Sequence, residues 1–220
     1  MADYVKRLLL FGPPGAGKGT QAANVAGRLR IKHVDTGSMI RENMDQGTPL
    51  GLEARSYVER GELVPNDVII RLIDDRLNRD DVASGWLLDG FPRSLDQARA
   101  LSEMGPDNSE PVERVIFLEV PEEVLVKRLS GRRICSKCKG VFNIATLPPD
   151  EKDLCPLCGG ELITRPDDNP EAIRNRFRVY RESTEPIGEY YENRGLLVRV
   201  DGTGEIEEVT DRVMNACKAD

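Results

Sequence analysis

A glycine-rich loop near the N-terminus constrains the fold of this chain more than any other feature. Residues 12–20 read Gly-Pro-Pro-Gly-Ala-Gly-Lys-Gly-Thr. A short apolar run at 5–11 comes directly before them, and a segment with helical spacing of apolar residues follows at 19–30. A strand, a glycine-rich turn and a helix in this order form a phosphate cradle, because glycines let several backbone N–H groups point at one anion. The sequence therefore predicts a P-loop that binds a nucleoside triphosphate.

The loop also supplies positive charge. The N-terminus of the following helix contributes roughly half a positive charge, and Lys18 contributes a full charge that reaches the outer phosphates. Gly19 stands where such loops usually place a serine or threonine that binds Mg²⁺, and Thr20 follows it. We therefore expect Mg²⁺ to be held largely through water, the nucleotide and an acidic residue elsewhere.

Apolar runs and helical segments alternate along much of the chain. Runs typical of buried parallel strands lie at 85–89, 114–120 and 196–200. Segments with the length and spacing of helices lie at 68–79, 94–104, 122–129, 171–193 and 206–218. This alternation predicts an α/β fold in which helices cover both faces of a parallel sheet.

Two segments interrupt the alternation. Residues 35–64 look helical, with no clear strand, and residues 131–168 combine four cysteines with several prolines and glycines. We expect both to be insertions at the ligand edge of the sheet, and the core to comprise 1–34, 65–130 and 169–220. Inside the second insertion, residues 148–153 have the composition of an exposed loop.

The four cysteines of the second insertion have the spacing of a metal site. Cys135 and Cys138 form one Cys-x-x-Cys pair, and Cys155 and Cys158 form another after sixteen intervening residues. This spacing is typical of a tetrahedral site with four thiolate ligands and no open position. We therefore expect a structural metal that stabilises a segment with almost no core of its own. Zinc is the preferred ion, although iron or cobalt would also suit four thiolates.

The overall composition argues against several classes of protein. The chain of 220 residues has a formal net charge of -7, whereas general nucleic-acid binders and anionic-membrane binders need a basic surface. The apolar stretch near the N-terminus is too short for a signal peptide or a membrane span, which predicts a cytoplasmic protein. In that compartment cysteines bind metals more often than they form disulfides, and we expect Cys217 to be a free structural thiol.

Five motifs together resemble a known enzyme family. They are the phosphate loop, Asp35-Thr36-Gly37-Ser38-Met39-Ile40-Arg41, Asp89-Gly90-Phe91-Pro92-Arg93, Gly131-Arg132-Arg133-Ile134 and Asp201-Gly202-Thr203. In this order they cover essentially the whole chain, which resembles the adenylate kinases that have a long lid with a four-cysteine metal site. The resemblance implies a P-loop nucleoside-monophosphate kinase fold with two mobile parts, an AMP-binding insertion at 35–64 and a lid at 131–168. It also implies reversible phosphoryl transfer from Mg-ATP to AMP, giving two ADP and balancing the adenine nucleotides.

The same resemblance implies roles for individual residues. The expected ATP-binding residues are Gly15, Ala16, Gly17, Lys18, Gly19, Thr20, Arg128 and Arg132. The expected AMP-binding residues are Thr36, Arg41, Gly90, Arg93, Gln97, Arg165 and Arg176, with Arg41 and Arg93 on the phosphate and Thr36 and Gln97 on the base. The residues expected to act in the transfer itself are Lys18, Arg93, Arg128, Arg132, Arg165, Arg176 and Asp89, with Asp89 orienting the waters of Mg²⁺. A cis peptide before Pro92 is also expected.

The chain departs from the family pattern at one position of the second motif. The family usually has an aspartate where this chain has Ser38, which removes one carboxylate near the phosphates. Physical reasoning otherwise agrees with the resemblance, since phosphoryl transfer to an anionic oxygen needs alignment and charge neutralisation rather than a base. We therefore expect His33, the single histidine, to be structural. Closure of the two insertions is expected to exclude water from the reacting phosphates.

Two alternative functions remain open at this stage. The first is a kinase that uses GTP or another nucleoside monophosphate, although the long lid argues against the short-lidded pyrimidine kinases and Gln97 favours adenine. The second is a zinc-ribbon module that binds nucleic acid on a P-loop scaffold. The ribbon has basic neighbours, but the chain is acidic and the segment has few aromatic residues for base stacking. We expect a monomer that binds ATP, AMP and ADP, and neither nucleic acid nor a membrane.

Overall fold

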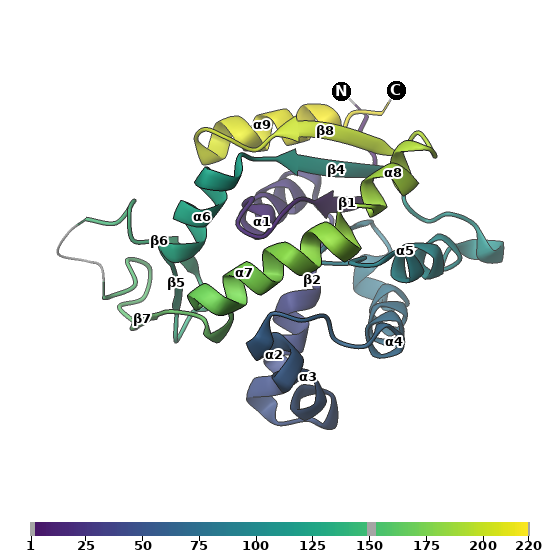
Figure 1. Cartoon of the computed structure of the whole chain (residues 1–220). Helices are drawn as coiled ribbons and strands as arrows, with labels where there is room; N and C mark the ends of the chain where they lie inside the picture. Colours follow the sequence, from purple (N-terminus) through teal and green to yellow (C-terminus); the bar gives the residue numbers. More distant parts are fainter. Residues whose placement is uncertain (1–2, 149–152, 220) are drawn as a thin grey trace.

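A parallel sheet forms the centre of the molecule in the computed structural model, which describes residues 3–148 and 153–219 (Figure 1). The exposed loop predicted at 148–153 therefore lies mostly outside the described residues. The strands occur in the order β2 (Lys32–Asp35), β3 (Trp86–Asp89), β1 (Arg7–Phe11), β4 (Arg114–Glu119) and β8 (Leu197–Asp201), and every neighbouring pair is parallel. The predicted α/β fold is confirmed.

Strand β2 was not predicted from the sequence. Val34 is the only buried residue among its four, so the strand lacks the apolar run that marks β1, β3 and β4. The strand lies at one edge of the sheet, where only β3 pairs with it. The strand places His33 beside Leu87 and Asp35 beside Asp89.

Helices cover both faces of the sheet, and successive strand residues point to opposite faces. Leu8 and Leu10 of β1 pack with α1 (Lys18–Leu29), α6 (Glu122–Ser130) and α9 (Ile206–Ala216). Leu9 and Phe11 pack with α4 (Asn66–Leu77), α5 (Leu95–Ser102) and α8 (Ile187–Glu192). Because both faces are buried, the central strands are nearly continuous apolar runs. Short 3₁₀ turns, η1 (Asp80–Val82) and η2 (Pro106–Asn108), precede β3 and follow α5.

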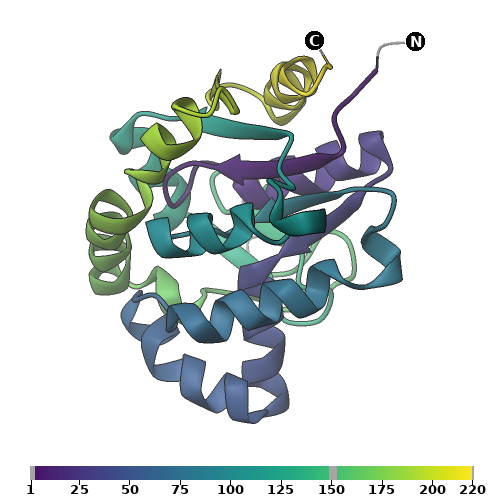
Figure 2. The same ribbon diagram turned by 90° about the vertical axis from the view of Figure 1, so that its right-hand side faces the viewer.

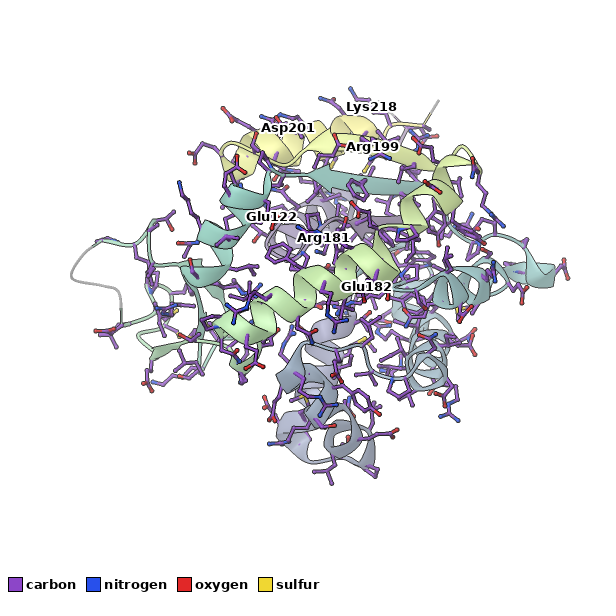
Figure 3. The ribbon with its side chains drawn as sticks, viewed as in Figure 1. Glu122, Arg181, Glu182, Arg199, Asp201 and Lys218 are labelled. Carbon is purple, nitrogen blue, oxygen red and sulfur yellow. The ribbon has the colours of Figure 1, made fainter. Side chains whose placement is uncertain are left out.

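The helix predicted at 171–193 is divided into three parts. It begins as α7 (Pro170–Val179), continues as a π-helical turn η5 (Tyr180–Thr184), and resumes after Pro186 as α8. A proline in mid-helix removes one backbone N–H donor and crowds the preceding turn, which explains the interruption. Arg181 of η5 forms an ion pair with Glu122 at the start of α6, and thus joins two neighbouring helices (Figure 3).

The first insertion is a pair of helices, as predicted. Helix α2 (Thr36–Gln46) begins at the N-cap Asp35, and α3 (Pro49–Arg60) begins at the N-cap Thr48. The two helices approach very closely, because a Cβ on Gly51 would lie only 2.0 Å from the carbonyl oxygen of Asn43. The pair lies at the bottom of both Figure 1 and Figure 2, below the sheet.

The second insertion is a small antiparallel sheet. Its strands occur in the order β6 (Val141–Asn143), β5 (Arg132–Cys135) and β7 (Leu162–Ile163). Helix α6 leads into it, and a 3₁₀ turn η4 (Pro166–Asp168) leads out of it into α7 (Figure 1). Among its described residues the apolar cluster consists of Cys135, Cys155 and Leu162 with Phe142 and Leu147, which is small, as predicted. No helix in the described part of the chain is long and apolar enough to cross a membrane.

Candidate active site and metal centre

The glycine-rich loop wraps around the N-terminus of α1. Gly15 and Gly17 have φ angles of 85° and 92°, in the left-handed region that suits glycine. Gly15 also packs against α6, since a Cβ there would lie 2.9 Å from Leu129 Cγ. Ala16 is buried, and Lys18 through Thr20 form the first turn of α1. The loop amides and the helix N-terminus thus occupy the predicted position after β1.

Lys18 lies folded over the loop. Its Nζ donates hydrogen bonds to the carbonyl oxygens of Gly12 at 2.7 Å and Pro13 at 2.9 Å. Burial lowers the pKa of Lys18 to about 8. The Asp89 carboxylate opposes this change, whereas the guanidinium groups of Arg93, Arg176 and Arg132 add to it. Burial and the three guanidinium groups together outweigh the attraction of Asp89 for the Lys18 charge.

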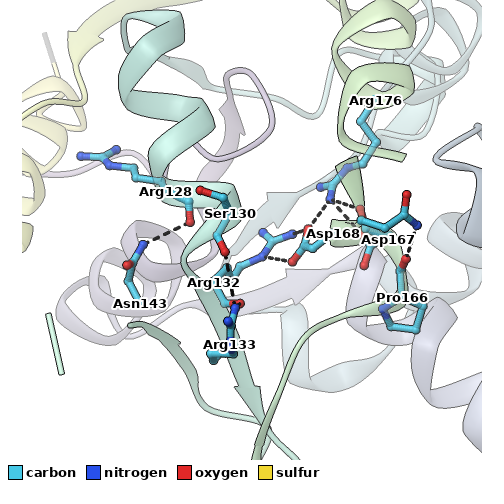
Figure 4. A network of polar contacts seen from close by, with 10 residues as sticks. Arg128, Ser130, Arg132, Arg133, Asn143, Pro166, Asp167, Asp168 and Arg176 are labelled. Atoms are coloured by element: carbon cyan, nitrogen blue, oxygen red, sulfur yellow. Dashed lines mark hydrogen bonds and ion pairs between the residues drawn. The ribbon is translucent and has the colours of Figure 1, made fainter. Parts of the chain in front are cut away.

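Two adjacent aspartates hold arginines from the lid and the core together (Figure 4). Asp168, whose side chain is fully buried, forms a two-point pair with Arg132 of β5. Arg176 of α7 lies 3.0 Å from Asp168 Oδ1 and 3.0 Å from Asp167 Oδ2. Burial raises the pKa of Asp167, but Arg176 and Arg132 outweigh it and hold that pKa below its usual value. Neither aspartate was predicted to belong to the site, although the two acids shortly after Arg165 were the available signal.

Arg128 joins the glycine-rich loop to the loop after β8. Its Nη1 and Nη2 each lie 3.2 Å from the carbonyl oxygen of Gly202, and Nη1 lies 3.4 Å from that of Ala16. The carbonyl of Arg128 accepts a hydrogen bond from Asn143 of β6, which ties the lid to α6 (Figure 4). The guanidinium of Arg128 therefore lies beside both loops, as expected for a group that contacts a nucleotide there.

Arg41 is held by two residues at the start of α2. Its Nη2 lies 2.9 Å from Ser38 Oγ and 3.5 Å from Asp35 Oδ2, and Ser38 Oγ also donates to the Asp35 carboxylate. Burial opposes ionisation of Asp35, but Arg41 and the hydrogen bonds from Ser38 lower its pKa. A carboxylate is therefore present beside Arg41 even though position 38 is a serine.

Asp89 ends β3 close to the glycine-rich loop. A Cβ on Gly19 would lie 3.4 Å from Asp89 Oδ2, so the carboxylate faces the first turn of α1. His33 Nε2 lies 3.7 Å from the same oxygen and has no hydrogen-bond partner among the described residues. The Asp89 carboxylate thus lies between the first turn of α1 and His33, and its role near Mg²⁺ stays a prediction.

The segment that follows Asp89 shapes a cleft. The peptide between Phe91 and Pro92 is cis, as expected. Arg93 Nε donates to the Gly90 carbonyl at 2.8 Å, and Thr184 of η5 donates to the Arg93 carbonyl at 3.0 Å. A small cleft of about 80 Å³ opens here; it is lined by Lys18, Gly90, Phe91, Pro92, Arg93, Arg176 and Thr184, among others.

Two residues predicted to bind a nucleotide have a buried polar atom with no partner among the described residues. The atoms are Arg165 Nε and Thr36 Oγ1. Burial lowers the pKa of Arg165 to about 10, and the charges of Arg41 and Arg132 contribute. Buried polar groups in native proteins are nearly always paired, so both atoms are candidates for contacts with a ligand. Both belong to the residues predicted to bind the second nucleotide.

The four predicted metal ligands come together in the lid. Their Sγ atoms all lie within 4.8 Å of one another, at 3.5 Å for Cys135 and Cys158 and 3.6 Å for Cys138 and Cys155. Four thiolates around Zn²⁺ at about 2.3 Å would be about 3.8 Å apart, so the cluster fits a tetrahedral ion. Burial opposes ionisation of Cys135, but backbone N–H groups of Cys138 and Lys137 outweigh it and lower the pKa of Cys135 to about 6. At Cys138 the backbone N–H of Gly140 favours the thiolate, but burial and the three neighbouring thiols outweigh it and raise the pKa to about 12.

Comparison with known proteins gives consistent matches. A family model described as adenylate kinase matches residues 10–196. An adenylate kinase of Methanocella arvoryzae is 49% identical over 212 residues, covering 96% of this chain and 98% of the relative. Adenylate kinases of Streptomyces avermitilis and Clostridium botulinum are 48% and 44% identical, covering 96% and 94% of this chain and 97% and 96% of theirs.

Proposed function

The chain belongs to the adenylate kinase family, and from that premise we propose how its residues divide between the two nucleotides. It is an enzyme that transfers a phosphoryl group reversibly between ATP and AMP, with Mg²⁺ accompanying ATP. One observation carries the proposed division. Lys18 lies folded over the glycine-rich loop, whereas Arg41 lies at the start of the first insertion, so the site offers cations for phosphate oxygens in two separate places.

The ATP phosphates are assigned to the glycine-rich loop. Backbone N–H groups of residues 15–20 and the α1 N-terminus bind oxygens, while Lys18 exchanges its carbonyl partners for phosphate. Arg128, which already lies beside both the loop and Gly202, contacts the bound nucleotide there. Arg132 enters from the lid on the other side of the triphosphate.

AMP is assigned to the opposite side of the cleft. Arg41 and Arg93 bind its phosphate in two-point contacts, for which the planar guanidinium is well suited. Thr36, whose buried hydroxyl has no partner among the described residues, and Gln97 contact the base. Gly90 brings the backbone against the nucleotide.

Arg165 and Arg176 are assigned to the phosphoryl group in transit. Arg165 has a buried unpaired Nε, and Arg176 is oriented by Asp167 and Asp168. The arginines neutralise the charge that spreads over the moving group, and the two binding sides align the attacking oxygen with it. When bound, Mg²⁺ neutralises charge on the phosphates of ATP, and Asp89 would orient its waters.

The lid is assigned a structural zinc ion. Cys135, Cys138, Cys155 and Cys158 would hold it, and the sulfur spacing supports this assignment over a disulfide, in which bonded sulfurs are about 2.05 Å apart. Four thiolates leave no coordination position for a substrate. The ion therefore stabilises the fold of the lid. Metal analysis of purified protein tests this, with one zinc per chain expected.

The remaining proposals concern the moving parts of the chain, its partners, its compartment and its oligomeric state. Residues 35–64 move as the AMP-binding part and 131–168 as the lid, on a core of 1–34, 65–130 and 169–220. The net charge of -7 supports an enzyme that does not bind nucleic acid. The thiolate cluster suits the reducing cytoplasm, and a monomer is the simplest arrangement.

A pair of matched variants tests the division of the two nucleotides. Arg41→Met is expected to raise the KM for AMP at least tenfold and to leave the KM for ATP within about twofold, since a charged hydrogen bond contributes roughly 1.5–3 kcal/mol. Arg128→Met is expected to raise the KM for ATP at least tenfold and to leave the KM for AMP within about twofold. The proposed division would be wrong if both variants changed both constants equally, or if their effects were exchanged.

A further inference from the structure

A set of interlocked hydrogen bonds surrounds the side-chain amide of Gln97. This residue lies on α5 and is only 2% exposed. Its Oε1 accepts a hydrogen bond from the backbone N–H of Arg93 at 2.7 Å, and its Nε2 donates to Asn66 Oδ1 at 2.8 Å. Asn66 Oδ1 also accepts from Ser94 Oγ at 3.2 Å.

These partners determine which end of the amide points in which direction. If the Gln97 amide rotated by half a turn, Oε1 would face the oxygen of Asn66. Its NH₂ group would then face the N–H of Arg93. Both contacts would pair like with like, an acceptor with an acceptor and a donor with a donor, and both existing hydrogen bonds would be lost. Asn66 and Arg93 therefore lock one orientation.

Asn66 and Ser94, which take part in these hydrogen bonds, both lie at helix N-termini. Asn66 is the first residue of α4. Ser94 is the N-cap of α5, where its Oγ accepts the backbone N–H of Gln97 at 3.3 Å. The oxygen of Asn66 is thus fixed by the same serine that caps the helix carrying Gln97.

The locked amide still has hydrogen-bonding capacity. An amide oxygen has two lone pairs and an amide nitrogen has two N–H groups, and the described partners use one of each. One lone pair on Oε1 and one N–H on Nε2 remain for a ligand. Adenine presents an N6 amino donor beside an N1 acceptor, which complements this pair. Guanine and hypoxanthine present an O6 acceptor beside an N1–H donor, which is the reverse pattern.

We propose that Asn66 is a positioning residue that sets the preference for a 6-amino purine over a 6-oxo purine, by locking the amide of Gln97. The inference deepens the proposed function and rests on its contact between Gln97 and the AMP base. Asn66 itself does not touch the nucleotide in this account. Its effect passes entirely through the orientation of Gln97.

The test compares AMP with IMP as phosphoryl acceptors at fixed Mg-ATP. IMP is chosen because it reverses the hydrogen-bonding pattern without adding the 2-amino group of GMP. In Asn66→Leu the acceptor is removed, so the ratio of kcat/KM for AMP to that for IMP is expected to fall about fivefold, the factor that one neutral hydrogen bond of about 1 kcal/mol represents. Asn66→Asp retains the acceptor and is expected to keep the ratio within about twofold of the wild-type value.

Two further variants separate this lock from other effects. Asn78→Leu, which removes an asparagine at the other end of α4, controls for loss of helix stability and is expected to leave the ratio unchanged. Gln97→Leu is expected to lower the ratio more than Asn66→Leu does. An unchanged ratio in Gln97→Leu would overturn the assigned base contact. A normal ratio in Asn66→Leu, or an equal fall in Asn66→Leu and Asn66→Asp, would overturn the lock while leaving that contact in place.

Discussion

Replacing Lys18 with methionine should abolish phosphoryl transfer and yet stabilise the nucleotide-free enzyme near neutral pH. The folded protein holds the lysine charge in a buried site among arginines, which lowers its pKa from 10.5 to about 8. This fall corresponds to about 3 kcal/mol of free energy that folding must supply while the group stays charged. Methionine has a similar length and no charge, so it removes that cost.

The net gain should be smaller than the charge effect alone. Lys18 donates hydrogen bonds to the carbonyl oxygens of Gly12 and Pro13, and methionine loses both. Because the pKa shift already includes the effect of the charge, these two bonds count here as those of the neutral amine, about 1 kcal/mol each, so Lys18→Met is expected to be roughly 1–2 kcal/mol more stable than wild type at pH 7. Between pH 8 and 10.5 the unfolded chain binds more protons at Lys18 than the folded one. Wild-type stability therefore rises through this window relative to the variant.

Urea unfolding of both proteins at a series of pH values from 7 to 10.5, without nucleotide and with metal saturated, measures this difference. The variant should be the more stable at pH 7, and the advantage should vanish or reverse by pH 10.5. Saturating Mg-ATP should stabilise only the wild type, since ligand binding favours the folded state in proportion to affinity. A variant that is less stable at pH 7, or a difference independent of pH, would refute the reasoning.

Three other perturbations test the remaining parts of the account. Cys155→Ala should lower the melting temperature and zinc content while the core stays folded by circular dichroism; a melting temperature equal with and without metal would contradict the structural role. Asp168→Asn should cost about 3–5 kcal/mol in urea unfolding, because it leaves Arg132 without its buried partner, and should lower kcat at least tenfold. An unchanged kcat would show that Asp168 does not position the arginines. Ser38→Ala should raise the KM for AMP about fivefold through loss of its hydrogen bond with Arg41. Equal changes in the KM for ATP would point to a general loss of folding instead.

The parts of the fold that bury long apolar runs were predictable from the sequence. β1, β3 and β4 were anticipated within one or two residues at either end, because buried parallel strands are apolar on both faces. β8, at one edge of the sheet, was anticipated as closely because Leu197, Val198 and Val200 still form an apolar run. β2, at the other edge, was not, since Val34 is the only aliphatic residue among its four. The division of the last long helix also escaped prediction, because the apolar spacing runs on through the π-turn before Pro186.

The functional site divides in a similar way. Motifs identify the residues expected to touch nucleotides, since loop glycines, arginines and paired cysteines are typical of phosphate and metal chemistry. The residues that orient them are polar side chains far away in the sequence. Asp168 reaches Arg132 across the whole lid, and Asn66 reaches Gln97 from another helix. Such pairs form only when the tertiary fold brings distant residues together, and no local sequence pattern predicts that.

The most direct test of the central claim measures every nucleotide by chromatography after the purified enzyme is mixed with Mg-ATP and, separately, AMP, GMP, CMP or UMP. The account predicts prompt formation of ADP with AMP, little transfer to the other acceptors, and almost no hydrolysis with Mg-ATP alone. Faster transfer to another monophosphate would contradict the assigned base contacts. Rapid hydrolysis of ATP without an acceptor would contradict the proposed exclusion of water by the two closing insertions.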